Sequence, residues 1–407
     1  MSQQIELPED PVREILVRLP VTSLTRFKSV CNSWRGTINH PDFIRDHLNH
    51  VHSRLKDGRD NLNDHDIIEQ NTLIATGSSY RVVYQSKLHS KQKRRSKFVS
   101  EAETITVLDE LPKLFPNQPD KFIPWHRVRS SCDGLLLITA HYRDREEDYL
   151  LIYNPTTREC KRVGALRPSN YHHMDAWGIG YDHTSQSYKV VRAPSSMVGT
   201  PVQVLSLKTD SWKTTTPFDD FLYKIQEERN PVTANRCPHW VVTKRNTDQQ
   251  DRTIIYFDPS EEIFKVMPPP STELAKDFLS GVARGFAWYL QIFEVRGGLG
   301  LCMNKGREEL SLWWMKEHGV KESWTKLYNV CKTPTSKVFF TTPWFLTKRG
   351  KLLFVWNATF YSYDPGSHTI KALPHRDHFC QRNILQSWRT TSLPTPYLET
   401  LVSPFTT

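Results

Sequence analysis

The residues best suited to bind a metal are two adjacent histidines. His172 and His173 are followed closely by Asp175, and imidazole nitrogens with a carboxylate form a common ligand set for transition metals. Successive side chains of an extended strand point to opposite faces, so the two histidines chelate one ion together only if the backbone bends. The alternative is a polar loop, which the sequence favours. We therefore predict no metal site and no bound cofactor.

The motifs of common enzyme classes are absent. The sequence has no P-loop, no G-x-S-x-G and no H-E-x-x-H. The glycine-rich residues 297–300 lack the last glycine of a dinucleotide-binding motif and suit a tight strand start. The 7 cysteines are scattered without a C-x-x-C pair, so neither a disulfide framework nor a zinc site is indicated. They fit a reducing cytoplasmic or nuclear compartment. We expect a protein that is not an enzyme.

The net charge of +10 is compatible with nucleic acid, an anionic surface or an acidic protein as partner. The densest basic cluster is Lys91, Lys93, Arg94, Arg95 and Lys97. Such a cluster is a nuclear-import signal, a phosphate contact or a hydrated loop. Basic stripes interleaved with aromatic residues are lacking, so a basic nucleic-acid-binding β protein is the alternative function, not the first. No apolar run approaches the roughly 20 residues of a membrane helix, so no membrane partner is expected.

Residues 7–45 have the apolar spacing of short helices, which would position the functional side chains of the N-terminal part. Val12, Ile15, Leu16 and Leu19 recur at helical spacing, and Pro20 then ends the first helix. Thr22 or Ser23 is the expected N-cap of the next helix. A second apolar run follows at steps of three and four: Leu24, Phe27, Cys31, Trp34 and Ile38. Pro41 then opens a further helix.

This helical segment is near the lower size limit for independent folding. Its large apolar side chains each gain roughly 1.5–3 kcal/mol when buried, but too few of them face inward to satisfy one another. Two interpretations stay open. The apolar surface is covered by another protein, or it packs on the rest of the same chain.

The order of residues in this segment resembles the F-box. The matching positions are Leu7, Pro8, Ile15, Leu16, Leu19, Pro20, Val21, Leu24, Phe27, Val30, Cys31 and Trp34. Pro11 stands where an aliphatic residue is common, and Asn32 stands where a basic residue is common. The resemblance implies that these residues dock the Skp-type adaptor of cullin-RING ubiquitin ligases.

A repeat is the main signal of the larger part of the chain. Apolar strands that end in turn residues recur about every 50 residues, at Tyr153, Leu205, Phe257, Trp313 and Tyr363. A second strand pair precedes each copy, so four strands per unit are expected, as in a propeller blade of the kelch kind. Residues 70–110 could supply a sixth unit. Closing the ring would then pair the earliest strands with the latest and hide both edges.

This larger part also resembles a family. The motifs C-D-G-L at 132–135, Y-N-P-T-T at 153–157, G-Y-D at 180–182 and Y-K-V-V at 188–191 look like the F-box-associated domain of plant F-box proteins. Residues 312–327 do so as well, and the match runs from about 130 to 375. The resemblance implies a domain that recruits a target protein.

Loops between the units are the candidates for target recognition, because rigid scaffolds present binding residues on loops. Residues 169–177 mix aromatic and polar side chains, as binding hot spots do. We predict target contacts for Tyr171, His172, His173 and Trp177, with a structural role in the blade as the alternative for Trp177. Trp212, Trp313 and Trp324 recur at matching repeat positions, which favours packing between blades over ligand binding.

Together these observations predict an α+β multidomain protein: a small all-α bundle followed by a large all-β, propeller-like domain. The expected boundaries are 1–47 for the F-box, 48–69 for a linker, 70–384 for the propeller-like domain and 385–407 for a C-terminal tail. Residues 49–68 are polar and charged, and the alternative for them is the frayed end of the last helix. The expected function is target recognition in an SCF-type ubiquitin ligase. In that function the helices dock the Skp-type adaptor and the β domain recruits a target for ubiquitination.

Overall fold

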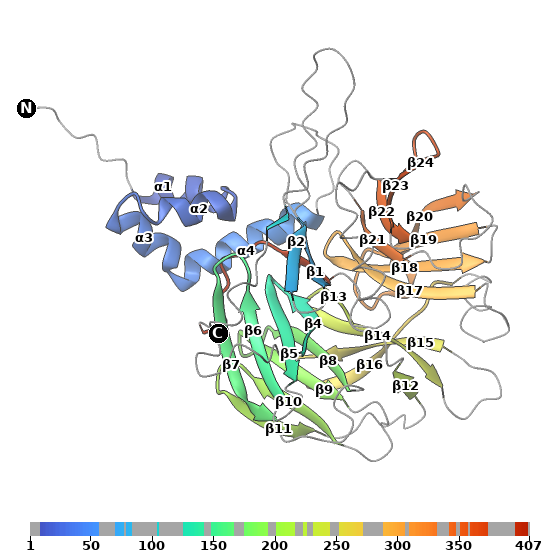
Figure 1. The fold of residues 1–407 in the computed structure, drawn as a ribbon, viewed down its shortest axis with the longest axis horizontal. Helices are drawn as coiled ribbons and strands as arrows, with labels where there is room; N and C mark the ends of the chain where they lie inside the picture. The colour runs from blue at the N-terminus through green and yellow to red at the C-terminus, as the bar shows by residue number, and fades with distance from the viewer. Residues whose placement is uncertain are drawn as a thin grey trace, which may run out of the picture.

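A bundle of α-helices lies at one side of a β-propeller in the computed structural model (Figure 1). The residues described are 9–56, 70–76, 79–83, 104–105, 125–141, 148–166, 175–193, 201–215, 223–225, 231–244, 252–271, 288–305, 309–331, 342–346, 351–356, 359–372 and 395–405. The predicted fold class, a helical bundle followed by a propeller of short antiparallel strands, is confirmed. None of the helices in these ranges is long and apolar enough to cross a membrane.

The bundle contains α1 (Glu9–Val17), α2 (Val21–Phe27), α3 (Asn32–Asn39) and α4 (Pro41–Lys56). The second apolar run of the sequence, expected as one helix, is divided between α2 and α3. Cys31 causes the break, because its backbone is extended and its Sγ accepts a hydrogen bond from the Trp34 N–H. The prediction of Thr22 or Ser23 as N-cap is wrong, since α2 begins directly after Pro20.

The described strands form six antiparallel sheets, numbered here as blades 1 to 6 in chain order. Blade 1 consists of β25 (Thr395–Leu398), β1 (Gln70–Thr76), β2 (Ser79–Val83) and β3 (Thr104–Ile105). Blade 2 consists of β4 (Trp125–Cys132), β5 (Leu135–His141), β6 (Asp148–Asn154) and β7 (Glu159–Leu166). Blade 3 consists of β8 (Ala176–Asp182), β9 (Ser187–Ala193), β10 (Val202–Ser206) and β11 (Ser211–Thr215).

Blade 4 has five strands, because two short strands share one edge of β14. They are β12 (Tyr223–Ile225) and β13 (Val232–Ala234), followed by β14 (Cys237–Lys244), β15 (Arg252–Asp258) and β16 (Ile263–Met267). Blade 5 contains β17 (Trp288–Val295), β18 (Gly298–Lys305), β19 (Glu309–Met315), a 3-10 turn (Lys321–Ser323) and β20 (Trp324–Cys331). Blade 6 contains β21 (Thr342–Leu346), β22 (Leu352–Trp356), β23 (Thr359–Asp364) and β24 (Thr369–Ala372).

The ring closes by pairing the two ends of the propeller sequence. β25 pairs antiparallel with β1, with Gln70 opposite Leu398 and Leu73 opposite Thr395. Residues 70–105 thus supply strands of a sixth unit, and the ring closes through the earliest and latest strands, two points that the repeat spacing leaves open. The pairing also shows that the predicted tail 385–407 is wrong as a boundary, because residues 395–398 form a strand of the propeller.

The sequence repeat reflects a turn that is built the same way in several blades. The side-chain Oδ1 of Asn154, Asp182, Asp258 and Asp364 accepts a hydrogen bond from the backbone N–H two residues later, at 2.8, 2.8, 2.9 and 3.0 Å. The residue four positions after each has positive φ, between 51° and 62°, and the four are Arg158, Gln186, Glu262 and His368. Asn and Asp favour this geometry because their side chains satisfy the backbone of the turn.

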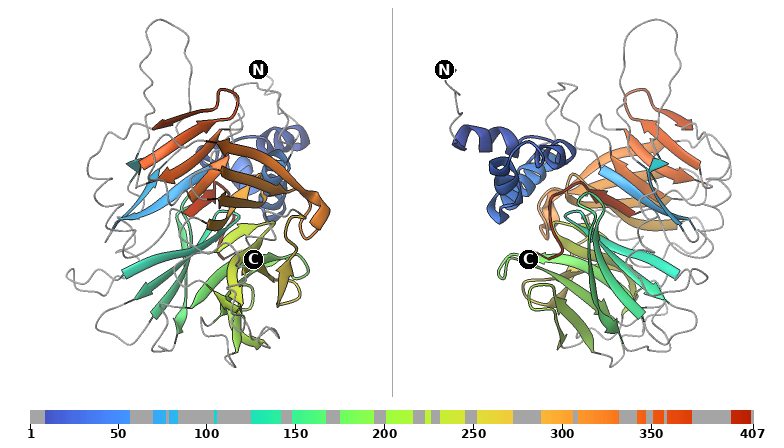
Figure 2. Two further views of the ribbon diagram at one scale, coloured as in Figure 1. Left: turned by 90° about the vertical axis from the view of Figure 1, so that its right-hand side faces the viewer. Right: turned by 60° about the vertical axis from the view of Figure 1, so that its left-hand side comes forward.

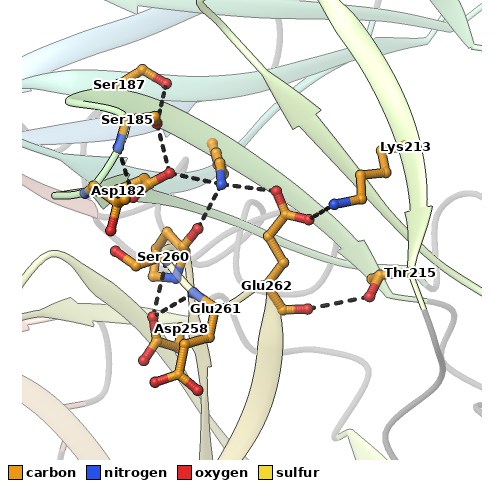
Figure 3. Close-up of polar contacts among 12 residues, drawn as sticks. Asp182, Ser185, Ser187, Lys213, Thr215, Asp258, Ser260, Glu261 and Glu262 are labelled. Atoms are coloured by element: carbon orange, nitrogen blue, oxygen red, sulfur yellow. Dashed lines mark hydrogen bonds and ion pairs between the residues drawn. The ribbon is translucent and has the colours of Figure 1, made fainter.

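Neighbouring blades are joined by apolar packing and by a buried lysine. Trp212 and Trp313 pack against core clusters, and Trp324 is buried in one, as predicted for repeated tryptophans. Lys189 of β9 donates to the Pro259 carbonyl at 2.9 Å and to Glu262 at 2.8 Å, both in the β15–β16 turn of blade 4 (Figure 3). The same Nζ lies 2.8 Å from the Asp182 carboxylate. This network fastens blade 3 to blade 4.

Candidate functional site

The helical bundle has a core of its own. It is made of buried apolar side chains from all four helices and one residue of the C-terminal segment: Leu16, Val21, Leu24, Ile38, Phe43 and Leu401. The prediction that Leu16, Val21 and Leu24 contact an adaptor directly is therefore wrong, because each is at most 3% exposed. Their role is to hold the helices together.

Other predicted adaptor-binding residues lie at the surface of the bundle. Ile15 is 58% exposed and Val30 is 60% exposed, the two exposed large apolar side chains among the described residues of the bundle. Pro20 and Cys31 are exposed as well, whereas Leu19, Phe27 and Trp34 are half-buried. The rings of Phe27 and Trp34 meet edge to face, with centroids 5.4 Å apart. Leu7 and Pro8 fall outside the described residues.

Local contacts fix the turn that presents Val30. The Arg35 guanidinium donates from Nε to the Lys28 carbonyl at 2.9 Å. The Val30 N–H donates to the Phe27 carbonyl at 3.1 Å, which closes the end of α2. Because the backbone is fixed on both sides of Val30, this side chain remains in solvent and does not fold back on the bundle.

Helix α4 joins the bundle to the propeller. Ile44 packs against both the bundle core and the cluster that fills blades 2 and 3, and Leu48 is buried within that second cluster. The predicted linker 48–69 is therefore wrong over residues 48–56, which continue α4, and the alternative interpretation of this stretch as the end of the last helix is the correct one there. Residues 57–69 lie outside the described part of the chain. The polar appearance of 48–56 arises because this end of α4 contacts the propeller partly through polar side chains.

The main polar contact at this junction is the buried carboxylate of Asp133. Its Oδ1 lies 2.7 Å from His52 Nε2 of α4. Its Oδ2 accepts from the Tyr188 hydroxyl of blade 3 at 2.9 Å and lies 2.9 Å from Arg236 Nε of blade 4. Burial alone would raise the pKa of Asp133, but His52, Arg236 and Tyr188 together lower the pKa of this carboxyl below its ordinary value. Asp133 stands in the C-D-G-L motif at 132–135, but no residue pattern around it indicates this role.

The C-terminal segment lies between the bundle and blade 2 (Figure 2). Asn154 Nδ2 donates to the carbonyls of Thr400 and Val402 at 3.1 and 2.7 Å. Thr400 Oγ1 donates to the Asp133 carbonyl at 2.6 Å. Gly134 has φ of +86°, and a Cβ there would lie 2.4 Å from Thr400 Oγ1. The segment predicted as part of a tail is thus an integral part of the junction.

A second buried polar pair connects blades 4 and 5. His239 Nε2 and His318 Nε2 lie 3.0 Å apart, and His239 Nδ1 contacts the Cys237 carbonyl at 2.8 Å. Burial, together with nearby His318, lowers the pKa of His239 to about 3. His239 is therefore neutral in the fold, and its ring donates from Nδ1 to the carbonyl while Nε2 accepts. No local pattern indicates this pair, because the two histidines are far apart in the chain.

The predicted target-binding residues are only partly described. Tyr171, His172 and His173 lie outside the described residues. Trp177 is 2% exposed and packs in the core of blades 2 and 3, with the Arg192 guanidinium 5.5 Å from its ring centroid. Its predicted target contact is wrong, and its alternative structural role is the correct one. Asp175 pairs with Arg192 at 2.8 Å.

Metal ligands do not gather in the described part of the chain. No group of three or more His, Cys, Asp or Glu side chains is placed there to hold a metal ion. The basic cluster at residues 91–97, for which a hydrated loop, a phosphate contact and an import signal are the interpretations, lies outside the described ranges.

Comparison with known proteins identifies both parts of the chain. Residues 5–46 match the F-box domain, and residues 95–403 match the F-box associated beta propeller domain. An F-box/kelch-repeat protein of Arabidopsis thaliana is 28% identical over 330 residues, which cover 80% of this chain and 79% of the relative. The F-box protein CPR1 of Arabidopsis thaliana is 26% identical over 362 residues, which cover 82% of this chain and 75% of that protein. The chain therefore belongs to the plant F-box proteins that carry an F-box associated beta propeller domain.

Proposed function

We propose that this F-box protein is the target-recognition subunit of an SCF-type, cullin-RING ubiquitin ligase. Its bundle docks a Skp-type adaptor, and its propeller recruits the protein to be ubiquitinated. The observation that carries the proposal is the division of apolar residues within the bundle. Leu16 and its neighbours form the internal core, whereas Ile15 and Val30 remain uncovered.

Such exposed side chains favour a partner. Burying each of them would contribute roughly 1.5–3 kcal/mol. The half-buried ring pair of Phe27 and Trp34 adds aromatic surface of the kind that dominates protein interfaces. The adaptor-binding set is thus reduced to Ile15, Pro20, Val30 and Cys31, with Leu19, Phe27 and Trp34 at its edge and Leu7 and Pro8 as further candidates.

The chain contributes proximity to the reaction, and the chemistry takes place in other subunits. Holding a target beside the transferring enzyme converts an encounter between separate molecules into a reaction within one complex. In this proposal the protein is not an enzyme and needs no cofactor.

The target site is proposed for the side of the propeller away from the bundle. The β6–β7 turn, which begins at Asn154, contacts the C-terminal segment beside the bundle. Strand β7 runs antiparallel to β6, so its far end at Leu166 lies on the opposite side. Tyr188, at the start of β9, donates to Asp133 beside the bundle. The start of β8, which runs antiparallel to β9, therefore lies away from the bundle as well. The sequence between β7 and β8 contains Tyr171, His172 and His173, which remain the candidates for target contact.

Purified Skp-type adaptor tests the docking surface directly. Ile15→Asp and Val30→Asp each place a charge on the exposed surface, and each is expected to weaken adaptor binding about tenfold or more in a titration. Ser53→Asp changes an exposed residue of α4 and is the matched control, with binding as in wild type. Leu16→Asp would not discriminate, because it disrupts the bundle core itself.

Unchanged adaptor affinity in both Ile15→Asp and Val30→Asp, with native circular dichroism spectra, would refute the docking surface. Target candidates are then sought by affinity capture under proteasome inhibition, with wild type and Ile15→Asp compared. The substitution is preferable to removing the bundle, because removal would expose Leu401 and the propeller side chains that Leu48 covers. Proteins retained by both chains are target candidates, and proteins lost with the variant belong to the ligase.

A further inference from the structure

We infer that the F-box of this chain is completed by Leu401, a residue near its C-terminal end, which thereby fixes the orientation of the bundle on the propeller. The match to the F-box domain ends at residue 46, and Leu401 lies within the match to the propeller domain. The bundle core nevertheless includes this leucine, which is 3% exposed. The core of one domain is therefore closed by a residue of the other.

Adjacent side chains of the C-terminal segment enter different domains. Leu401 packs with Leu16 and Leu24 in the bundle. Val402, 5% exposed, packs with Leu135 and the rest of the cluster in blades 2 and 3. Because one side chain enters the bundle and the next enters the propeller, this two-residue step connects the two cores.

The backbone of the segment is held on both sides of Leu401. Asn154 Nδ2 donates to the carbonyls of Thr400 and Val402, and Thr400 Oγ1 donates to the Asp133 carbonyl. Gly134 permits the close approach, because a Cβ there would lie 2.6 Å from the Leu398 carbonyl oxygen. Buried hydrogen bonds of this kind are costly to break without replacement. Leu401 therefore cannot slide out of the bundle while blade 2 stays folded.

Helix α4 provides a second, separate attachment. Leu48 is buried in the propeller cluster, and His52 lies one helical turn further along and contacts the Asp133 carboxylate at 2.7 Å. A single contact would allow the bundle to pivot. An apolar contact and a polar contact on α4, together with Leu401, remove that freedom. The bundle and the propeller then form one body, and Leu401 is a positioning residue.

The consequence for ubiquitin transfer rests on the proposed function, whereas the attachment itself does not. If the bundle docks the adaptor, a fixed orientation sets the distance between a bound target and the transferring enzyme. A reaction that depends on proximity becomes slower when the distance and orientation of the reacting groups vary.

Hydrogen exchange of the full chain, followed by mass spectrometry, tests the inference. Leu401→Ala is expected to speed amide exchange in α1 to α3 about tenfold or more, because it leaves a cavity in the bundle core. Val402→Ala is the matched control, since the neighbouring side chain belongs to the other core. It is expected to speed exchange in β5 and β6 and to leave α1 to α3 as in wild type. Leu401→Met should restore protection of the bundle.

A distance measurement separates positioning from simple loss of stability. Spin labels are introduced on noncanonical residues at Ser33 of α3 and Lys371 of β24, both exposed. The expected distance distribution is narrow in wild type and in Val402→Ala, and broad in Leu401→Ala. Wild-type exchange rates in α1 to α3 of Leu401→Ala would overturn the inference. So would a distribution in wild type as broad as that of the variant. Neither readout requires an adaptor, so failure here is distinguishable from failure of the proposed function.

Discussion

Replacing Asp133 with Asn tests the junction between the bundle and the propeller. The carboxylate is surrounded by three donors, from His52, Tyr188 and Arg236. Asn keeps one acceptor oxygen, but its amide N–H group then faces donors, and the Arg236 guanidinium, 14% exposed, loses its counter-charge. Removing one partner of a buried ion pair costs about 3–5 kcal/mol, and one retained hydrogen bond offsets about 1 kcal/mol of that. We expect the free energy of unfolding to fall by about 3 kcal/mol.

Urea denaturation at pH 7, followed by circular dichroism, measures this loss. Asp364→Asn is the control, because Asp364 lies in an exposed turn and Asn154 already serves the same turn geometry in blade 2. Asp364 also pairs with Lys351, but this ion pair lies at the surface and such pairs contribute little, so the variant should denature close to wild type. An Asp133→Asn chain that denatures at the wild-type urea concentration would refute the role of the carboxylate.

The pH dependence of Asp133 provides an independent check. Its partners lower the pKa of the carboxyl in the folded state below the unfolded value. The stabilisation is therefore complete above the unfolded pKa of about 3.9 and is lost as the pH falls below it. The difference in unfolding free energy between wild type and Asp133→Asn should shrink below about pH 4. A difference that stays constant there would show that the charge contributes nothing.

Three further substitutions are tested by the same urea assay. Gly134→Ala should cost about 2–4 kcal/mol, because positive φ and a close approach both oppose a side chain; Gly319→Ala, with φ of +80° but open space, should cost only about 1–2 kcal/mol. Lys189→Met should cost about 2–3 kcal/mol, because it removes the lysine from the Asp182 carboxylate and leaves Glu262 with Lys213 alone. Lys213→Met, at a side chain 67% exposed, should change little. Burial and His318 lower the pKa of His239 to about 3 in the fold, so the free energy of unfolding falls as the pH drops below about 6.5, the ordinary pKa of histidine. In His239→Gln, the change of unfolding free energy with pH should be smaller by up to about 1.4 kcal/mol per pH unit. Equal slopes between pH 6.5 and 4.5 would contradict that assignment.

The propeller could be predicted because the same turn residues recur at a regular spacing in the sequence. Asn154, Asp258 and Asp364 each satisfy the backbone of the same turn between the third and fourth strands, so the chemistry of the turn is visible at a regular spacing. That the ring could close followed from counting units. These features depend on residues close together in sequence, where propensities and spacing are informative.

The division of the bundle surface could not be predicted from spacing. Ile15 and Leu16 are neighbours on one short helix, and both match the apolar pattern, yet one is 58% exposed and the other 1%. Which of them faces inward depends on where α4 and Leu401 lie, and that is decided by contacts between distant parts of the chain. The same reason explains the wrong linker and tail boundaries.

The junction between the bundle and the propeller could not be predicted, because none of its residues carries a recognisable sequence signal by itself. His52 looks like part of a polar linker, and Leu401 and Val402 look like an unstructured end. Their roles arise from Asp133 and Asn154, which lie in separate motifs of blade 2. No local pattern shows that these five positions lie at one junction.

The pairing of β25 with β1 also bears on how the protein is made. A ribosome delivers β1 long before β25, so the emerging polypeptide carries an unpaired strand edge until translation has nearly reached the last described residues. Open edges of this kind recruit other strands, which makes the nascent chain a natural client for chaperones. A product of premature termination before residue 395 would keep that edge permanently and would also lack the leucine that closes the bundle, so aggregation and rapid degradation are its expected fate.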